Sequence, residues 1–379
     1  MMNKESIGLY IHIPFCIKKC NYCDFCSFDD LKAEERDMYV SALCNELARE
    51  SEELHGRTVD TVFFGGGTPS LLNENQFENI FSVIGKYYKR TESAEISAEI
   101  NPATASAEKL RFMHNLGINR LSIGMQSLNE NELSALGRAH TVRDFYNCYE
   151  SARNAGFDNI NADVMYGIPE QTLSSFEKTL DITLSLGCEH ISAYSLKIEE
   201  GTPFFKNKAS LVLPDEDSEY AMYLMCAEKL EQAGYFHYEI SNYAKAGREC
   251  RHNLRYWQER EYIGAGASAY SYFKNKRYGN TRNIADYISN SGICEKVNVE
   301  TIGEREREYE YIMLALRLGR GIDDNEFKKL FGSSFFDKYE DKVNLFANSE
   351  YAERSGTSFH LTDKGMYVSN SIIYEFLEN

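Results

Sequence analysis

The chain has 379 residues, of which 43% are hydrophobic, and its 41 Lys and Arg against 58 Asp and Glu give a net charge of −17. This length allows one large domain and a smaller one. The acidic balance disfavours a general nucleic-acid binder, because phosphate affinity is built from Lys and Arg. No apolar stretch approaches the roughly 20 residues that span a bilayer, and no secretory leader precedes Ile7. We therefore expect a cytoplasmic protein that binds no nucleic acid.

The first half of the chain alternates short β-rich runs with helical periodicity, which is the pattern of a parallel α/β fold. The expected strands are 8–13, 58–64, 94–99, 120–124, 159–165 and 190–195. The expected helices are 33–54, 74–88, 106–115, 129–136, 142–155 and 172–186. Six βα units are too few to close the usual eight-stranded barrel. We therefore predict an open partial (β/α)6 barrel whose active site lies at the carboxyl ends of its strands.

The sequence changes character after residue 200. We divide it into a barrel over 1–200, a connecting region over 201–303 and a smaller α-rich domain over 304–379. Helices are expected over 215–233, 304–318, 324–331, 335–347 and from residue 362, with a hairpin near residue 355 and an irregular aromatic stretch over 237–257. The last domain is expected to contain a winged-helix-like element, whose acidic helices disfavour DNA binding.

Cys16, Cys20 and Cys23 stand at spacings of four and three after an apolar strand. Thiolates are the soft ligands of iron–sulfur clusters, and three of them leave one iron of a four-iron cluster open to a small chelating molecule. The motif resembles the signature of the radical S-adenosylmethionine (SAM) enzymes, in which SAM binds that iron. The alternative is a structural zinc site with Cys26 as fourth ligand, although such sites more often pair two Cys-x-x-Cys knuckles. The other six cysteines are expected to be buried thiols.

Polar and glycine residues follow several of the predicted strands. Gly65–Gly67 follow the second strand, where backbone can approach a ligand such as the SAM amino group without interference from Cβ; no Gly-Lys-Ser/Thr follows, which disfavours a phosphate loop. Glu99 ends the third strand and is suited to ribose hydroxyls. Each of Gln126, Arg138 and Asp163 alone would be an ordinary surface residue. Together they predict a ring at the barrel mouth, in which Arg138 suits the SAM carboxylate and Gln126 and Asp163 suit ribose or amino groups.

A series of motifs along almost the whole chain resembles one family. The motifs are Tyr-Ile-His-Ile-Pro-Phe-Cys, Gly-Gly-Gly-Thr-Pro-Ser, Glu-Ile-Asn-Pro, Gly-Met-Gln-Ser, Leu-Gly-Arg-Ala-His, Asp-Val-Met-Tyr-Gly-Ile-Pro and Ser-Leu-Lys-Ile-Glu-Glu-Gly-Thr-Pro. They are similar to those of the anaerobic coproporphyrinogen III oxidase family and its heme chaperone branch. This resemblance implies that one SAM contacts Tyr10, Gly66 and Glu99. It also implies that the oxidase's second SAM, if present here, is surrounded by Tyr22, Gly67, Thr68, Gln126, Arg138, Asp163 and Ser195.

Three features distinguish the chain from the oxidase. The segment ahead of the cluster motif is short, and Phe25 stands where the oxidase has a fourth cysteine, the extra thiol being displaced by one position. The segment from His252 to Trp257 is similar to the His-Asn-x-x-Tyr-Trp motif that is associated with heme in the chaperone branch. His252 is a candidate axial ligand of heme iron with Cys250 as a rival, and Tyr256 and Trp257 offer flat faces to a porphyrin. The alternative is a packing motif against the barrel mouth.

By resemblance, the predicted function is that of a radical-SAM-type heme chaperone that binds a [4Fe-4S] cluster, SAM and heme. The resemblance implies that heme is delivered to acceptors such as respiratory hemoproteins, through which the protein associates peripherally with the membrane. It also implies an electron donor such as a flavodoxin or ferredoxin. If SAM is cleaved, the reduced cluster supplies the electron that yields a 5′-deoxyadenosyl radical. One alternative is an oxygen-independent coproporphyrinogen III dehydrogenase, which uses that radical on propionate side chains. The other is a cluster-bearing chaperone that binds SAM and never cleaves it.

Overall fold

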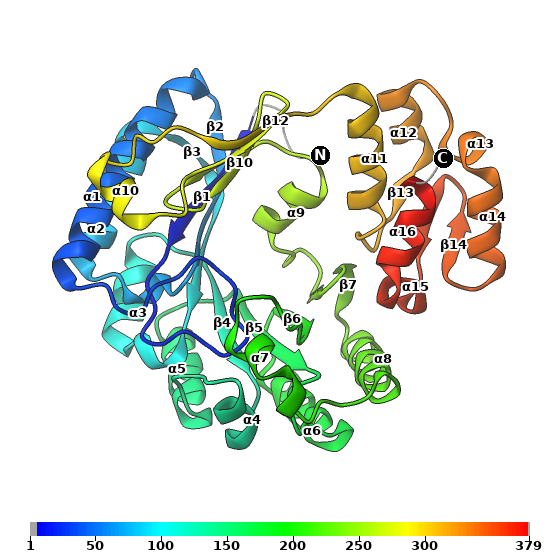
Figure 1. Cartoon of the computed structure of the whole chain (residues 1–379), viewed down its shortest axis with the longest axis horizontal. Coiled ribbons are helices and arrows are strands. Elements are labelled where there is room, and N and C mark those ends of the chain that lie inside the picture. Colours follow the sequence, from blue (N-terminus) through cyan, green and yellow to red (C-terminus); the bar gives the residue numbers. More distant parts are fainter. Residues whose placement is uncertain (1–5, 378–379) are drawn as a thin grey trace.

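One large sheet forms the centre of the molecule, and the helices pack around it (Figure 1). The computed structural model describes residues 6–377. Within them the strand order of this sheet is β12-β11-β10-β9-β1-β2-β3-β4-β5-β6-β8-β7. Its central strands run parallel to one another. They are β1 (Ser6–Ile13), β2 (Thr58–Gly66), β3 (Lys89–Ile100), β4 (Arg120–Gln126), β5 (Ile160–Tyr166) and β6 (His190–Ser195).

Helices cover the outer face of these parallel strands. They are α1 (Ala33–Glu50), α2 (Glu74–Tyr87), α3 (Ala107–Asn115), α4 (Glu130–Ala135), α5 (Val142–Asn154) and α6 (Leu173–Leu186). β4 is buried at every residue and β2 everywhere except its two ends, as expected of parallel strands covered on both faces. Asn73, Thr141 and Thr172 begin α2, α5 and α6, and the side-chain oxygen of each accepts a hydrogen bond from the backbone three residues later.

The chain after β6 extends the sheet at both edges. After α7 (Pro203–Lys206) and α8 (Glu216–Gln232), β7 (Phe236–Glu239) and β8 (Asn242–Ala244) pair with each other, and β8 pairs antiparallel with β6. At the other edge β9 (Tyr262–Ala265) pairs in parallel with β1. It is followed by β10 (Tyr270–Phe273), β11 (Lys276–Gly279), α10 (Ile284–Ser289) and β12 (Val297–Thr301). Between the two edges lies α9 (Arg251–Trp257), visible in the open centre of Figure 1.

A smaller domain of helices and three short strands completes the chain. Its helices are α11 (Glu304–Ala315), α12 (Asp324–Phe331), α13 (Phe335–Lys338), α14 (Glu340–Asn348), α15 (Asp363–Tyr367) and α16 (Ser369–Leu377). Its strands are β13 (Ile322–Asp323), β14 (Ala352–Ser355) and β15 (Ser358–Leu361). The domain contacts the rest of the chain through His237 Nδ1, 3.0 Å from Asp363 Oδ1, and through the ring of Tyr367, whose centroid lies 4.8 Å from that of Tyr220.

The predicted fold class is confirmed. The six βα units form an open partial barrel, since no strand within residues 6–377 joins β12 to β7, and the C-terminal domain carries a winged-helix-like hairpin in β14 and β15. The stretch 237–257, expected to be irregular, contains β8 and α9, and the helix expected over 335–347 is interrupted at Tyr339. The division at residues 200 and 303 stays a prediction. No helix in the described residues is long and apolar enough to cross a membrane.

Candidate SAM and cluster site

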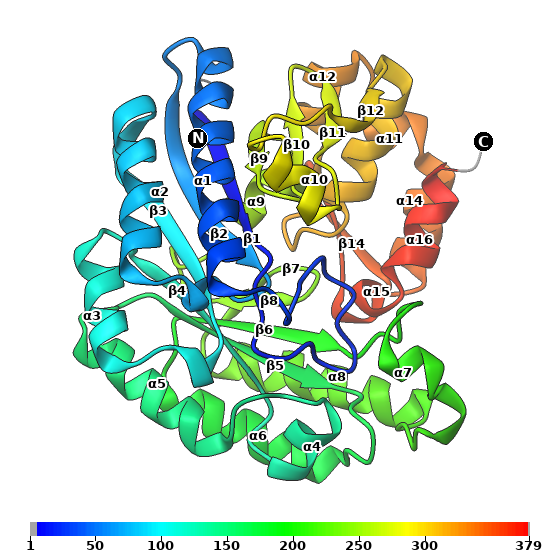
Figure 2. The same ribbon diagram turned by 60° about the vertical axis from the view of Figure 1, so that its left-hand side comes forward.

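The three predicted cluster cysteines lie in the loop of residues 14–32, which follows β1 and lies across the open end of the central strands (dark blue in Figure 2). The base of the loop is closed because Phe28 N–H donates to Pro14 O at 2.7 Å and Cys16 N–H donates to Phe28 O at 2.9 Å. Its tip is held by Asn21, whose N–H donates to Leu136 O at the end of α4 at 3.0 Å. The loop is therefore closed at its base by its own backbone and held at its tip by the barrel.

The three thiols share one electrostatic environment. Burial raises the pKa of Cys16 and that of Cys23, the latter to about 11, and the charge of Cys20 raises both pKa values further. Arg138 Nη1 lies 3.5 Å from Cys20 Sγ, and Thr68 Oγ1 lies 3.8 Å from Cys16 Sγ. Arg138 supplies a positive charge that favours the thiolate form of Cys20. Thiolates are the soft ligands of iron–sulfur clusters, so the three cysteines fit a [4Fe-4S] cluster.

The arrangement of the thiols bears on the zinc alternative. Within residues 6–377, no group of three or more His, Cys, Asp and Glu side chains is placed to hold one metal ion, whereas a four-iron cluster binds each thiolate at a separate iron atom. Cys26 has partners of its own: its Sγ lies 3.7 Å from Arg282 O, and its carbonyl is hydrogen-bonded to His12 Nε2 at 2.8 Å. The other ring nitrogen of His12 lies 3.0 Å from the Tyr10 hydroxyl.

The glycine loop packs directly beneath the cluster loop. Gly66 has φ +110°, and a Cβ placed there would lie 2.3 Å from the His12 ring. A Cβ at Gly67 would lie 2.7 Å from Phe15 O, and Gly67 N–H donates to Ile13 O at 2.9 Å. Both positions therefore require glycine, because any side chain would push the two loops apart.

Glu99 and Asp163 place two carboxyl groups inside the barrel. Glu99 Oε2 accepts a hydrogen bond from Gly66 N–H at 3.0 Å, which joins the end of β3 to the glycine loop. Burial, and then the charge of Asp163, raise the pKa of Glu99 to about 7. Asp163 accepts from Asn161 Nδ2 at 2.7 Å, and burial raises its pKa as well. The charge of Asp163 therefore acts on Glu99, as expected for residues of one ring.

Arg138 and Gln126 meet at Gly124. Arg138 Nη2 donates to Gly124 O at 2.7 Å, and a Cβ at Gly124 would lie 3.0 Å from Arg138 Nη2 and 3.1 Å from Gln126 Nε2. Gln126 has φ +66°, so the backbone turns sharply at the end of β4. Arg138 also interacts with Tyr22 of the cluster loop, whose pKa burial raises. Ser195, at the end of β6, donates to Glu219 of α8 and so lies at the edge of the group.

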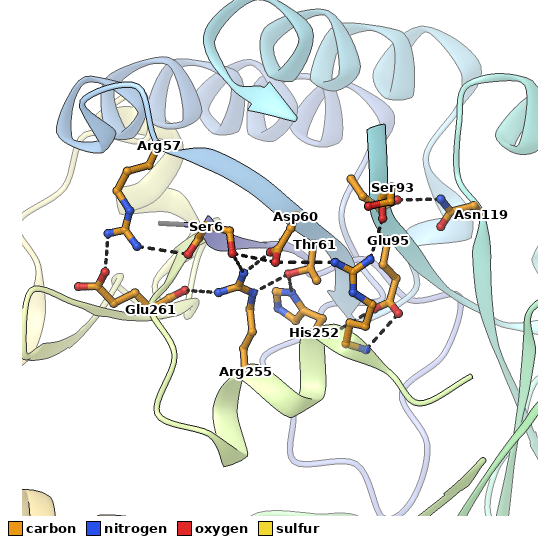
Figure 3. A network of polar contacts seen from close by, with 12 residues as sticks. Ser6, Arg57, Asp60, Thr61, Ser93, Glu95, Asn119, His252, Arg255 and Glu261 are labelled. Carbon is orange, nitrogen blue, oxygen red and sulfur yellow. Dashed lines mark hydrogen bonds and ion pairs between the residues drawn. The ribbon is translucent and has the colours of Figure 1, made fainter. Parts of the chain in front are cut away.

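The His-Asn-x-x-Tyr-Trp segment forms α9, whose side chains and backbone bond to residues of β1, β2 and β3 (Figure 3). Arg255 is only 1% exposed and bonds to Asp60, to Ser6 Oγ at 3.0 Å and to Thr61 Oγ1 at 3.1 Å. His252 N–H donates to Glu95 Oε1 at 3.1 Å. The segment is thus anchored inside the barrel.

The last two candidate heme contacts differ in their surroundings. The Tyr256 hydroxyl lies 2.9 Å from His252 Nε2, and its ring meets that of Tyr262 edge-on at 4.6 Å. Trp257 is half-buried and forms a side-chain hydrogen bond with Glu239, a carboxyl group whose pKa burial raises to about 7. Cys250, the rival iron ligand, is fully buried, and burial raises its pKa to about 12.

Known proteins identify the family. A model of the "Radical SAM superfamily" matches residues 10–182, and one of the "HemN C-terminal domain" matches residues 303–368. A "Heme chaperone HemW" of Bacillus subtilis (strain 168) is 35% identical over 97% of this chain and 98% of its own. The chain belongs to the HemW family. The "Heme chaperone HemW" of Escherichia coli (strain K12) is 33% identical over the full length of both chains.

A solved structure supports the fold of this HemW family member. It is that of the coproporphyrinogen III oxidase HemN from Escherichia coli, described as a radical SAM enzyme, with a TM-score of 0.84 over 97% of this chain and 89% of that one. Sequence identity is 22%, so the likeness concerns the fold. The radical SAM membership implies a [4Fe-4S] cluster and SAM, in agreement with the cysteine loop described above.

Two side chains at the site were not predicted. His140 orders Arg138, because its Nδ1 lies 3.3 Å from Arg138 Nε and its Nε2 is bonded to Met125 O at 3.1 Å. Burial and the charge of Arg138 lower the pKa of His140 to about 3, so the ring is neutral and can accept from the guanidinium. The only sequence signal was its place in the Leu-Gly-Arg-Ala-His motif. Asn21, which holds the loop tip, gave no signal beyond lying between two cysteines.

Proposed function

We propose that this protein is a cytoplasmic heme chaperone of the radical SAM type, which binds one [4Fe-4S] cluster, SAM and heme and transfers heme to acceptor hemoproteins. The observation that carries the proposal is the 35% identity to a protein named heme chaperone over 97% of the chain. The cluster loop supports the radical SAM part of it. Respiratory hemoproteins are the proposed acceptors, reached by peripheral contact with the membrane, and a flavodoxin or ferredoxin is the proposed electron donor.

The cluster and SAM are assigned to one end of the barrel. Cys16, Cys20 and Cys23 hold the cluster, and Arg138 offsets the thiolate charge at Cys20. When reduced, the cluster supplies the electron that could cleave bound SAM. Gly66 and Gly67 let the glycine loop pack closely against the cluster loop, and Glu99 is positioned by its bond to Gly66 N–H.

The Glu99 carboxyl group, whose pKa is about 7, can hold or release a proton near neutral pH. When it is ionised, the Glu99 carboxylate can accept hydrogen bonds from hydroxyl groups such as those of the SAM ribose. Arg138 is oriented by Gly124 O and His140, which supports its assignment to the SAM carboxylate. Tyr256 and Trp257 are the aromatic surfaces assigned to the porphyrin.

Two substrates offered in parallel test this proposal. Anaerobically reconstituted protein is titrated with hemin, and the same preparation is incubated with coproporphyrinogen III, SAM and a reductant. We expect a saturable Soret band at about one heme per chain, and no decarboxylated product. Protoporphyrinogen formed at a catalytic rate without a stable heme complex would instead identify an oxygen-independent coproporphyrinogen III dehydrogenase.

A further inference from the structure

His252 is enclosed by aromatic rings. Its side chain is 0% exposed. Its ring stacks on that of Phe63 with centroids 5.4 Å apart and planes at 26°, and on that of Tyr10 at 6.4 Å and 29°. The ring of Tyr256 meets it edge-on at 5.2 Å and 90°. A porphyrin needs open space around the nitrogen that ligates its iron, and these rings fill the space around His252.

Both ring nitrogens of His252 are already bonded within the protein. Nδ1 lies 2.9 Å from Thr61 Oγ1, and Nε2 lies 2.9 Å from the Tyr256 hydroxyl. A neutral imidazole has one N–H donor and one acceptor nitrogen, so these two hydroxyl partners satisfy it completely. Burial and the charge of Arg255 lower its pKa to about 3, so the ring is neutral. Ligation of iron would break one of these bonds and leave a hydroxyl group without its partner.

The helix that carries His252 has little freedom to move. Arg255, one turn later, passes so close to β1 that a Cβ on Gly8 would lie 2.6 Å from its Cδ. Its guanidinium is fixed by Asp60 and by Glu261 O at 3.0 Å. Since breaking a buried ion pair is costly, α9 holds His252 in place against β1 and β2.

A chain of contacts leads from His252 to the cluster loop. The Tyr10 ring stacks on His252, and the Tyr10 hydroxyl is 3.0 Å from His12 Nδ1. His12 Nε2 is bonded at 2.8 Å to Cys26 O, three residues beyond the last predicted cluster ligand. The His12 ring is also the group that a Cβ on Gly66 would meet. Tyr10 and His12 therefore join α9 to both the cluster loop and the glycine loop.

From these contacts we infer that His252 is a positioning residue for the SAM and cluster site, which it reaches through Tyr10 and His12, and that it is not the ligand of heme iron. The inference goes beyond the proposed function, because it assigns the histidine of the heme-associated motif to the other cofactors. Two consequences follow. Heme is ligated by a group outside the buried face of α9, and His252 contributes to SAM binding even when no heme is present.

Two substitutions separate positioning from ligation. His252→Ala removes the ring on which Tyr10 stacks, and His252→Phe restores a ring that cannot bind iron. Full-length, anaerobically reconstituted protein is used for each, with circular dichroism to confirm the fold. SAM affinity is measured by calorimetry, the reduced cluster by its electron paramagnetic resonance spectrum with and without SAM, and hemin binding by the Soret band.

We expect His252→Ala to weaken SAM binding roughly three- to tenfold, which is the range of one lost aromatic contact, and to alter the change that SAM produces in the cluster spectrum. His252→Phe should restore both. Neither variant should shift the Soret band or change hemin affinity. A lost or shifted Soret band in both variants, with SAM binding unchanged, would overturn the inference.

Two more variants protect the test against simple misfolding. Thr61→Val removes the partner of Nδ1 without touching the histidine, and should reproduce the SAM effect in weaker form. Tyr256→Phe frees Nε2, and under the ligation hypothesis it should tighten hemin binding; we expect no tightening. His360→Gln, on β15 of the C-terminal domain, is the matched control. If wild-type protein binds no hemin, the proposed function fails, while the SAM and spectral measurements still decide the role of His252.

Discussion

Replacing Glu99 with glutamine should stabilise the protein at alkaline pH while it weakens SAM binding. Burial and the neighbouring Asp163 raise the pKa of the Glu99 carboxyl from its usual 4.5 to about 7. Between these values the folded protein holds a proton that the unfolded chain has lost, so stability falls as the pH rises. A rise of this size corresponds to roughly 3 kcal/mol. Because part of the Glu99 side chain is exposed to solvent, which screens the effect, we expect about 1–3 kcal/mol of extra stability for Glu99→Gln at about pH 8.

Urea unfolding of the cluster-free protein measures this effect. The free energy of unfolding of Glu99→Gln and of the wild type should differ little at about pH 4.5 and clearly at about pH 8. Glu92→Gln, on the exposed part of the same strand, is the matched control and should change neither value. Calorimetry with the reconstituted protein should show weaker SAM binding for Glu99→Gln. Equal stabilisation at both pH values, or destabilisation at about pH 8, would show that the raised pKa of Glu99 is not the cause.

Three further predictions concern the loops and the anchor of α9. Cys26→Ala should keep the broad visible absorbance of the reconstituted protein, whereas removal of any one of the three proposed cluster ligands should abolish it. Gly66→Ala should lower the free energy of unfolding by about 2–4 kcal/mol and weaken SAM binding, because its Cβ would overlap the His12 ring and its φ is +110°. Asp60→Asn should cost about 3–5 kcal/mol in urea unfolding, because it leaves the charge of Arg255 buried without its partner.

Matched controls make these outcomes decisive. Gly56 also has a positive φ, +81°, but a Cβ there would meet nothing within 4 Å, so Gly56→Ala should show the backbone cost alone. Lys274 pairs with Glu53 at the surface, and Lys274→Ala should leave the free energy of unfolding nearly unchanged. Equal losses in Gly66→Ala and Gly56→Ala would rule out the overlap with His12. A loss for Asp60→Asn no larger than for Lys274→Ala would mean that the buried pair is not a strong anchor.

The parallel strands and the site loops could be predicted because their signals are local. Each strand is a short β-rich run ended by glycine or polar residues, and the motifs that follow are placed by the strands themselves. β8 and β9 were missed because they are short and lack alternation, and they form only through pairing with β6 and β1 at opposite edges of the sheet. Pairing between strands so far apart in the chain cannot be recognised from the residues of one short segment.

The surroundings of His252 could not be predicted either, because its partners are distant in the sequence. Its partner Thr61 lies 191 residues away, so the sequence alone suggested a candidate ligand of heme iron beside two aromatic residues. Only the fold reveals that both nitrogens are bonded and that Tyr10 covers the ring. Arg138 is an intermediate case: its place in the ring was predicted from its motif, while its support by His140 and Gly124 required the structure.

Transfer of heme to an acceptor is the activity that defines a heme chaperone, and it can be measured directly. Protein loaded with one heme per chain is mixed under nitrogen with the heme-free form of a respiratory hemoprotein, and the two are separated after incubation. We expect the Soret band to move from the chaperone to the acceptor, and the acceptor to regain activity faster than it does with free hemin at the same concentration. Heme that stays bound, or an acceptor that gains activity no faster than with free hemin, would contradict the assignment as a heme chaperone.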